Sequence, residues 1–108
     1  MLLKRKNWTR DETLLAFRLY CFTPFGNIHK GNSTIISLAA QIGRTPSAIV
    51  MKLVNFASLD PVQQRRGVQG LKNASALDLE IWKEFKQNSE SIAYESQEVL
   101  ELRGFQVH

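Results

Sequence analysis

The sequence is poor in the residues that build disulfide frameworks and metal sites. Its 108 residues contain one cysteine, Cys21, and two histidines, His29 and His108. A lone cysteine forms no internal disulfide, so the sequence predicts a reducing, cytoplasmic setting and a buried thiol. Because His29 has no second histidine, cysteine pair or carboxylate at ligand spacing, we expect no metal site and no cofactor.

Long apolar runs are also missing. No stretch reaches the roughly 18 apolar residues that a membrane-spanning helix needs, so no membrane partner is expected. Apolar residues make up 44% of the chain and charged residues 22%, as in ordinary globular proteins. This length supports one modest core, and we therefore expect residues 1–108 to form a single domain.

Acidic residues are scarce in the first two thirds of the chain. Residues 1–72 contain eleven Lys and Arg against three Asp and Glu, whereas residues 73–108 contain three against seven. The formal net charge of +4 conceals this asymmetry. A basic body with an acidic tail favours a polyanionic partner for residues 1–72, and a solubilising mixture of charges is the alternative.

Residues 33–60 have the pattern of a helix-turn-helix. Asn32 or Ser33 can cap a first helix, and Gly43 ends it because glycine adopts the left-handed conformation without steric cost. Thr45 then supplies a hydroxyl cap, and Pro46 occupies the first helical position, where no N–H is needed. Two short helices joined by such a tight turn are typical of DNA-binding domains.

The second helix of this pattern, expected over residues 45–57, has two unlike sides. At 100° per residue, Ile49, Leu53 and Phe56 fall on an apolar side. The other side is predicted to face outward with small, polar or flexible residues, which suit contacts to base edges. The candidate base contacts are Ser47, Met51, Lys52 and Asn55, and an ordinary solvated helix face is the competing interpretation.

Candidate phosphate contacts flank this helix on both sides in the sequence. A basic arm precedes the first helix, although a frayed terminus would have the same sequence. Residues 62–72 could form a short β-hairpin wing that clamps phosphates, with a flexible linker as the alternative. The candidates are Lys4, Arg5, Lys6, Arg44, Thr45, Arg65, Arg66 and Lys72.

Helical periodicity in the remaining segments predicts an all-α fold, a compact helical domain around the helix-turn-helix. A capping box, Thr9 with Glu12, opens a largely buried helix over residues 10–20, and Trp8 before it is expected to cover the core. Ser75 and Asp78 open a helix over 75–87 in the same way. A last helix, residues 90–102, has a thin apolar stripe and several acids.

The segments WTRDETLLAFRLYCFTPFG, IGRTPSAIVMKLVNFASLDP, GLKNAS and IAYESQ resemble the N-terminal region of bacterial HNH endonucleases of the restriction type. This resemblance spans Trp8 to about Leu102 and is most specific over Gly43–Pro61. It implies a region that binds DNA or targets a nuclease to it, through either the base sequence or a base modification. It also implies that residues 89–108 bridge to a C-terminal HNH domain.

The sequence departs from that family in its catalytic half. An HNH site requires a histidine base and metal ligands on a ββα hairpin, and only His29 and His108 are present here. We therefore expect a non-catalytic module that binds double-stranded DNA and has no small-molecule substrate. The alternative is a protein-interaction or homodimerisation module that uses the acidic last helix.

Overall fold

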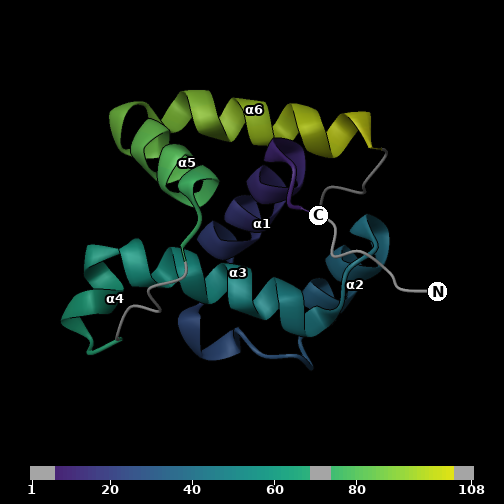
Figure 1. Ribbon diagram of the computed structural model, residues 1–108, viewed down its shortest axis with the longest axis horizontal. Coiled ribbons are helices and arrows are strands. Elements are labelled where there is room, and N and C mark those ends of the chain that lie inside the picture. Colours follow the sequence, from purple (N-terminus) through teal and green to yellow (C-terminus); the bar gives the residue numbers. More distant parts are fainter. Residues whose placement is uncertain (1–6, 69–73, 104–108) are drawn as a thin grey trace.

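The described part of the chain is entirely helical. The computed structural model describes residues 7–68 and 74–103, and within these ranges it contains six α-helices, a single-turn 3₁₀ helix and no strand (Figure 1). The α-helices are α1 (Arg10–Phe22), α2 (Ser33–Ile42), α3 (Pro46–Leu59), α4 (Pro61–Arg65), α5 (Ala76–Gln87) and α6 (Ser89–Leu102), and the 3₁₀ helix is η1 (Phe25–Asn27). The predicted all-α class is therefore confirmed. None of the described helices is both long and apolar enough to cross a membrane.

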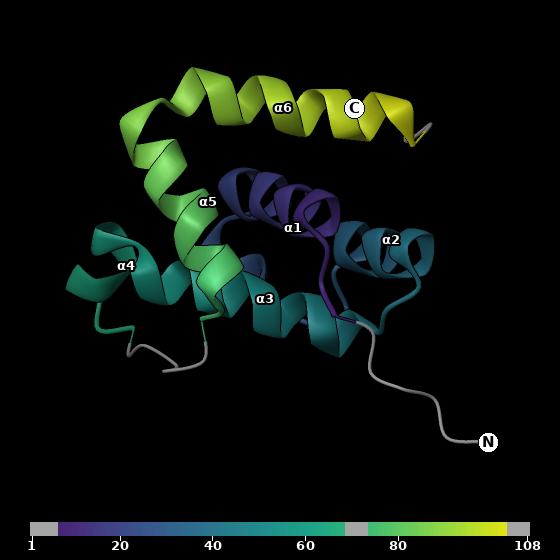
Figure 2. The ribbon, with the colours of Figure 1, turned by 45° about the horizontal axis from the view of Figure 1, so that its top comes forward.

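Helix α1 is the middle layer of the domain. Figure 2 shows α6 along one side of α1 and α3 along the other, with α2 beside them. The Phe17 side chain is 2% exposed, and its ring meets those of Phe56, Trp82 and Phe85 edge to face, with centroids 5.0, 5.9 and 5.0 Å away. Such ring pairs add to the stabilisation from apolar burial. Helices α1, α3 and α5 therefore converge on one aromatic cluster.

Helices α1, α2, α3, α5 and α6 begin and end within two residues of where the sequence placed them, because local caps fix their ends. The Thr9 hydroxyl accepts a hydrogen bond from the Glu12 backbone N–H, and the Glu12 carboxylate accepts one from that of Thr9, both at 3.1 Å. Ser75 and Asp78 form the same reciprocal box at the start of α5. Each box satisfies two backbone donors that the helix itself leaves unpaired.

The expected β-hairpin wing over residues 62–72 is not seen where the chain is described. Residues 62–65 belong to α4, and residues 69–72 lie outside the described residues. The Asp60 carboxylate accepts a hydrogen bond from the Val62 N–H at 2.9 Å, and Pro61 occupies the first turn of α4. An Asx cap followed by proline is the same start signal as Thr45–Pro46, and it makes a helix here.

Cys21 is not the buried residue that its apolar neighbours predicted. It lies on the exposed side of α1, near the end of the helix. Partial desolvation of the thiol, together with the nearby Asp60 charge, raises the pKa of Cys21 to about 11. The thiol therefore stays protonated and weakly nucleophilic at neutral pH.

Arg10 fastens α5 and α6 to the start of α1. Its Nη1 lies 2.9 Å from the Glu84 carboxylate, and its Nε and Nη2 each donate to Glu95 at 2.9 Å. The paired hydrogen bonds from Arg10 hold the pKa of Glu95 below its usual range. A guanidinium shared by two carboxylates favours one orientation of the two helices against α1.

Candidate nucleic-acid interface

The turn between α2 and α3 has the geometry of a helix-turn-helix corner. The Asn32 side chain caps α2 by accepting from the Thr34 and Ile35 N–H groups at 2.9 and 3.2 Å. Gly43 ends α2 with φ of 72°, and its N–H donates to the Ala39 carbonyl. The Thr45 hydroxyl then accepts from the Ala48 N–H at 3.1 Å and starts α3. The hydroxyl of Thr45, a candidate phosphate contact, thus already has a structural partner.

The predicted outward side of α3 divides into two parts. Ser47 is exposed and Met51 is 50% exposed, as expected for residues that could approach a ligand. Lys52 and Asn55 are 6% and 7% exposed, so their predicted outward position is wrong. For Lys52 the reason is tertiary, because α5 packs against α3 and pairs Asp78 with this lysine, which the periodicity of α3 alone could not reveal.

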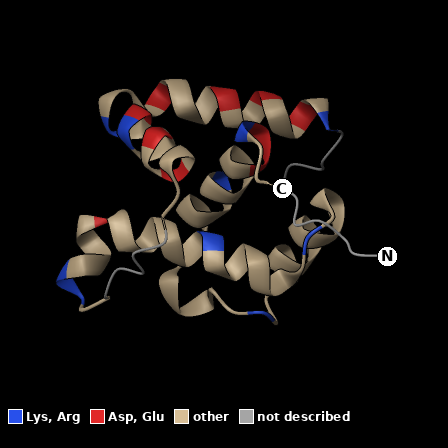
Figure 3. Cartoon of the chain, viewed as in Figure 1, with Lys and Arg blue, Asp and Glu red and all other residues tan. Residues whose placement is uncertain are grey.

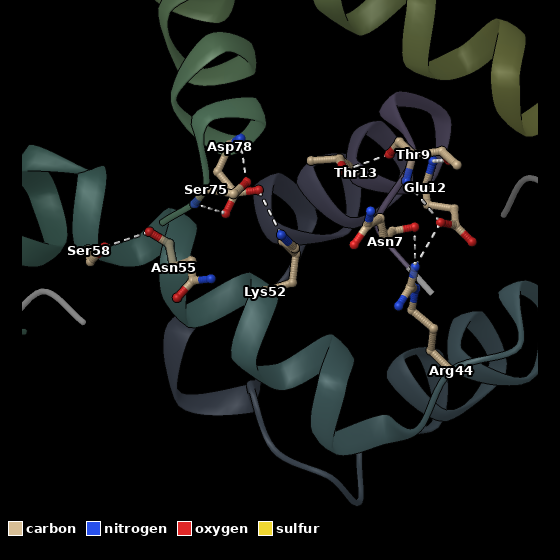
Figure 4. A network of polar contacts seen from close by, with 10 residues as sticks. All are labelled: Asn7, Thr9, Glu12, Thr13, Arg44, Lys52, Asn55, Ser58, Ser75 and Asp78. Atoms are coloured by element: carbon tan, nitrogen blue, oxygen red, sulfur yellow. Dashed lines mark hydrogen bonds and ion pairs between the residues drawn. The ribbon is translucent and has the colours of Figure 1, made fainter. Parts of the chain in front are cut away.

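Lys52 forms a buried ion pair inside the domain (Figure 4). Its Nζ lies 2.9 Å from Oδ1 of Asp78, whose side chain is fully buried and whose Oδ2 accepts from the Ser75 N–H. The same ammonium lies 4.7 Å from the centroid of the Trp8 ring. Lys52 therefore joins α3 to the capping box of α5 and is not free to read a base edge.

Arg44 also forms an ion pair inside the domain. Its Nη2 donates to the Glu12 carboxylate and to the Asn7 carbonyl, both at 3.0 Å, and its guanidinium lies 4.2 Å from the Trp8 ring centroid. The Arg44 side chain is only 10% exposed. This residue was predicted to contact phosphate, but here it anchors the segment before α1 to the turn of the helix-turn-helix (Figure 4).

Trp8 therefore lies between two cations that come from different elements. Arg44 belongs to the turn before α3 and Lys52 to the middle of α3, and each is also paired with a carboxylate of α1 or α5. Cation–π contacts of this kind are strongest where the cation is shielded from water. The predicted role of Trp8 as a cover on the core is confirmed, since it packs against the core cluster.

Two of the basic residues predicted to contact phosphate remain exposed in the described structure. Arg65 and Arg66 lie at the end of α4 with solvent-exposed side chains. Lys4, Arg5, Lys6 and Lys72 lie outside the described residues. Sequence reasoning did not select Lys30, which is exposed in the loop between η1 and α2. Lys30 could have been recognised as an exposed cation from the sequence, because it lies between two glycine-bearing turns and has no acidic neighbour.

Charge is segregated between the two sides of the domain (Figure 3). Among the described residues, the stretch 23–68 contains five Lys and Arg and a single carboxylate, Asp60. The stretch 74–103, which forms α5 and α6, contains seven Asp and Glu against three Lys and Arg. A polyanion is therefore attracted to the side of α2, α3 and α4 and repelled by the side of α5 and α6.

The described residues contain no group of three or more His, Cys, Asp or Glu side chains arranged to hold a metal ion. His29 is exposed. In comparisons with known proteins, no family model, no curated protein and no solved structure matches this chain.

Proposed function

We propose that this chain is a double-stranded DNA-binding helix-turn-helix module. The observation that carries the proposal is the α2–α3 corner, closed by Gly43 and Thr45, on the side of the domain that is almost free of carboxylates. A helix-turn-helix places the start of its second helix toward base edges, while flanking cations contact phosphates.

The structure narrows the residues that could make these contacts. Ser47 and Met51 remain as the base-facing candidates, because Lys52 and Asn55 are buried. Arg65 and Arg66 remain as described phosphate contacts, and the anchored Asn7 keeps the point from which the basic arm leaves next to the start of α3. A small hydroxyl and a flexible thioether favour contact with a thymine or modified-cytosine methyl group over a bidentate amide contact.

Fluorescence anisotropy on a labelled duplex at several salt concentrations tests the proposal. Each phosphate contact contributes about 0.9 to the slope of log affinity against log salt, so the double variant Arg65→Ala/Arg66→Ala should reduce that slope by about 2 on every sequence. Arg103→Ala, an exposed arginine at the end of α6, is the matched control. No duplex binding at low salt, or binding indifferent to salt, contradicts the proposal.

We further propose that the module targets an HNH-type nuclease and does not itself cut DNA. The support is the sequence resemblance over Trp8–Leu102, together with the lack of a metal-binding cluster among the described residues. Incubating supercoiled plasmid with the chain and Mg²⁺ or Mn²⁺ tests the second part. Nicking that persists in highly purified protein would contradict it.

One observation supports a second candidate, a protein-interaction or dimerisation role for α6. Its acidic surface also presents two large apolar side chains, Tyr94 at 69% and Leu102 at 85% exposure. Light scattering at increasing concentration separates the two candidates. A chain that stays monomeric and still binds duplex supports the DNA-binding role, whereas a dimer disrupted by Tyr94→Ser supports the second.

A further inference from the structure

A cavity of about 390 Å³ opens where the end of α1, α4 and α5 meet, away from the helix-turn-helix corner. Its lining includes Phe25, Asp60, Gln63, Arg66, Trp82 and Phe85. Its volume falls within the usual range for small-ligand sites. We propose that this cavity binds a single unstacked nucleobase, with the attached phosphate on Arg66. The inference rests on the proposed DNA-binding function and gives it a second contact point.

The walls of the cavity are aromatic. Phe25, Trp82 and Phe85 all line it and are only partly buried, so part of each ring surface faces the opening. Phe17 packs against Trp82 and Phe85 from the core side and fixes their positions. Preformed ring surfaces of this kind bind flat heteroaromatic groups by stacking, and such stacking is largely independent of which base is bound.

Two of the polar side chains that line the cavity, Asp60 and Gln63, can accept hydrogen bonds from a ligand. Oε1 of Gln63 is buried and accepts no hydrogen bond from the part of the chain that the structure describes. Beside it, Asp60 accepts from the Tyr20 hydroxyl at 2.6 Å and from the Val62 N–H at 2.9 Å. Carboxylate oxygens can accept further hydrogen bonds. An edge with ring N–H or amino donors, as guanine, adenine and cytosine present, complements these acceptors.

Arg66 supplies the charge that a nucleotide requires. It lines the cavity and is solvent-exposed, so its guanidinium is available at the opening. A base stacked on one of these rings would leave its phosphate at the opening, where the Arg66 guanidinium can form a charge-assisted hydrogen bond with it. Asp60 inside the cavity and Arg66 at its rim thus match the two ends of a nucleotide.

Nuclear magnetic resonance on the full chain tests this inference without requiring duplex binding. The two tryptophans, Trp8 and Trp82, give two indole N–H signals, which a Trp82→Phe variant assigns. Titration with deoxyguanosine, deoxycytidine and thymidine monophosphates should move the Trp82 signal and leave the Trp8 signal in place. Thymidine monophosphate, which has a single ring N–H donor, should bind at least about threefold more weakly than deoxyguanosine monophosphate.

Two substitutions, each at an exposed or half-exposed residue of the cavity, test whether the nucleotide binds there. Gln63→Met keeps the side-chain length and removes the acceptor, and Arg66→Ala removes the cation; each should weaken nucleotide binding about fivefold or more. Gln97→Met and Arg103→Ala, on the distant α6, are the matched controls and should change nothing. Saturating mononucleotide that moves neither signal, or that moves the Trp8 signal alone, overturns the inference. Nucleotide binding without duplex binding would instead contradict the proposed function and leave the cavity assignment intact.

Discussion

The ion pair between Lys52 and Asp78 allows a direct test of whether Lys52 stabilises the fold or contacts DNA. If Lys52 is structural, Lys52→Met should destabilise the fold and leave the DNA affinity of the folded molecules unchanged. The substitution keeps the length of the side chain and removes its charge. Among the described residues, it leaves the fully buried Asp78 carboxylate with the Ser75 N–H as its hydrogen-bond partner.

The magnitude follows from this burial. Removing one partner of a buried ion pair typically costs about 3–5 kcal/mol, because the remaining charge stays desolvated. Domains of this size unfold with roughly 5–15 kcal/mol, so the loss is a large fraction of the total. Lys86→Met, at an exposed lysine of α5, is the matched control and should change stability by less than about 0.5 kcal/mol.

Urea unfolding followed by circular dichroism measures the difference. In a double-mutant cycle, Asp78→Asn keeps an acceptor for Ser75 and removes the buried charge. The double variant should therefore be more stable than the sum of the two single losses predicts, by at least about 1.5 kcal/mol. If Lys52→Met costs no more than Lys86→Met, or if it lowers duplex affinity tenfold while unfolding is unchanged, the structural role of Lys52 is refuted.

Three further predictions concern single features. Arg10 lowers the pKa of Glu95 in the folded state, and this contributes stability above the unfolded pKa of about 4.5 that is lost as the pH falls through the lower folded pKa. In Arg10→Gln, the free energy of unfolding should therefore depend less steeply on pH in this acid range, as measured by circular dichroism. With a pKa of about 11, Cys21 should react with iodoacetamide at pH 7.5 many times more slowly than free cysteine, and unfolding in urea should remove the difference. Gly43→Ala should lower the free energy of unfolding by about 1–2 kcal/mol, because φ is 72°, and Gly43→Asn should cost less; equal losses would contradict this reasoning.

Features set by neighbouring residues were predictable from the sequence. The α2–α3 corner, the two capping boxes and the ends of five helices all depend on contacts within about four residues. Helix α4 could have been recognised in the same way, because Asp60–Pro61 is a start signal of the same kind as Thr45–Pro46. The β-hairpin wing was predicted instead because of the glycines that follow α4.

The positions of Lys52 and Asn55 could not be deduced in that way. Helical periodicity assigns residues to sides of α3, but it does not say which sides another helix covers. Lys52 and Asp78 are 26 residues apart, and a lysine on a mixed face normally indicates solvent. The pairing becomes apparent only when α5 is packed against α3. The burial of Lys52 is therefore set by tertiary contacts that the local sequence pattern does not contain.

The buried cations also change how the net charge should be interpreted. Arg44 and Lys52 contribute to the basic balance of residues 1–72, but each is neutralised by a carboxylate of α1 or α5. Their positive charge therefore stabilises the arrangement of the helices and contributes little to the attraction of a polyanion at long range. Among the described residues of the stretch 23–68, that attraction comes from Lys30, Arg65 and Arg66. The proposed phosphate contacts of the described residues therefore lie at the end of α4, whereas Arg44 and Lys52 hold the helices together.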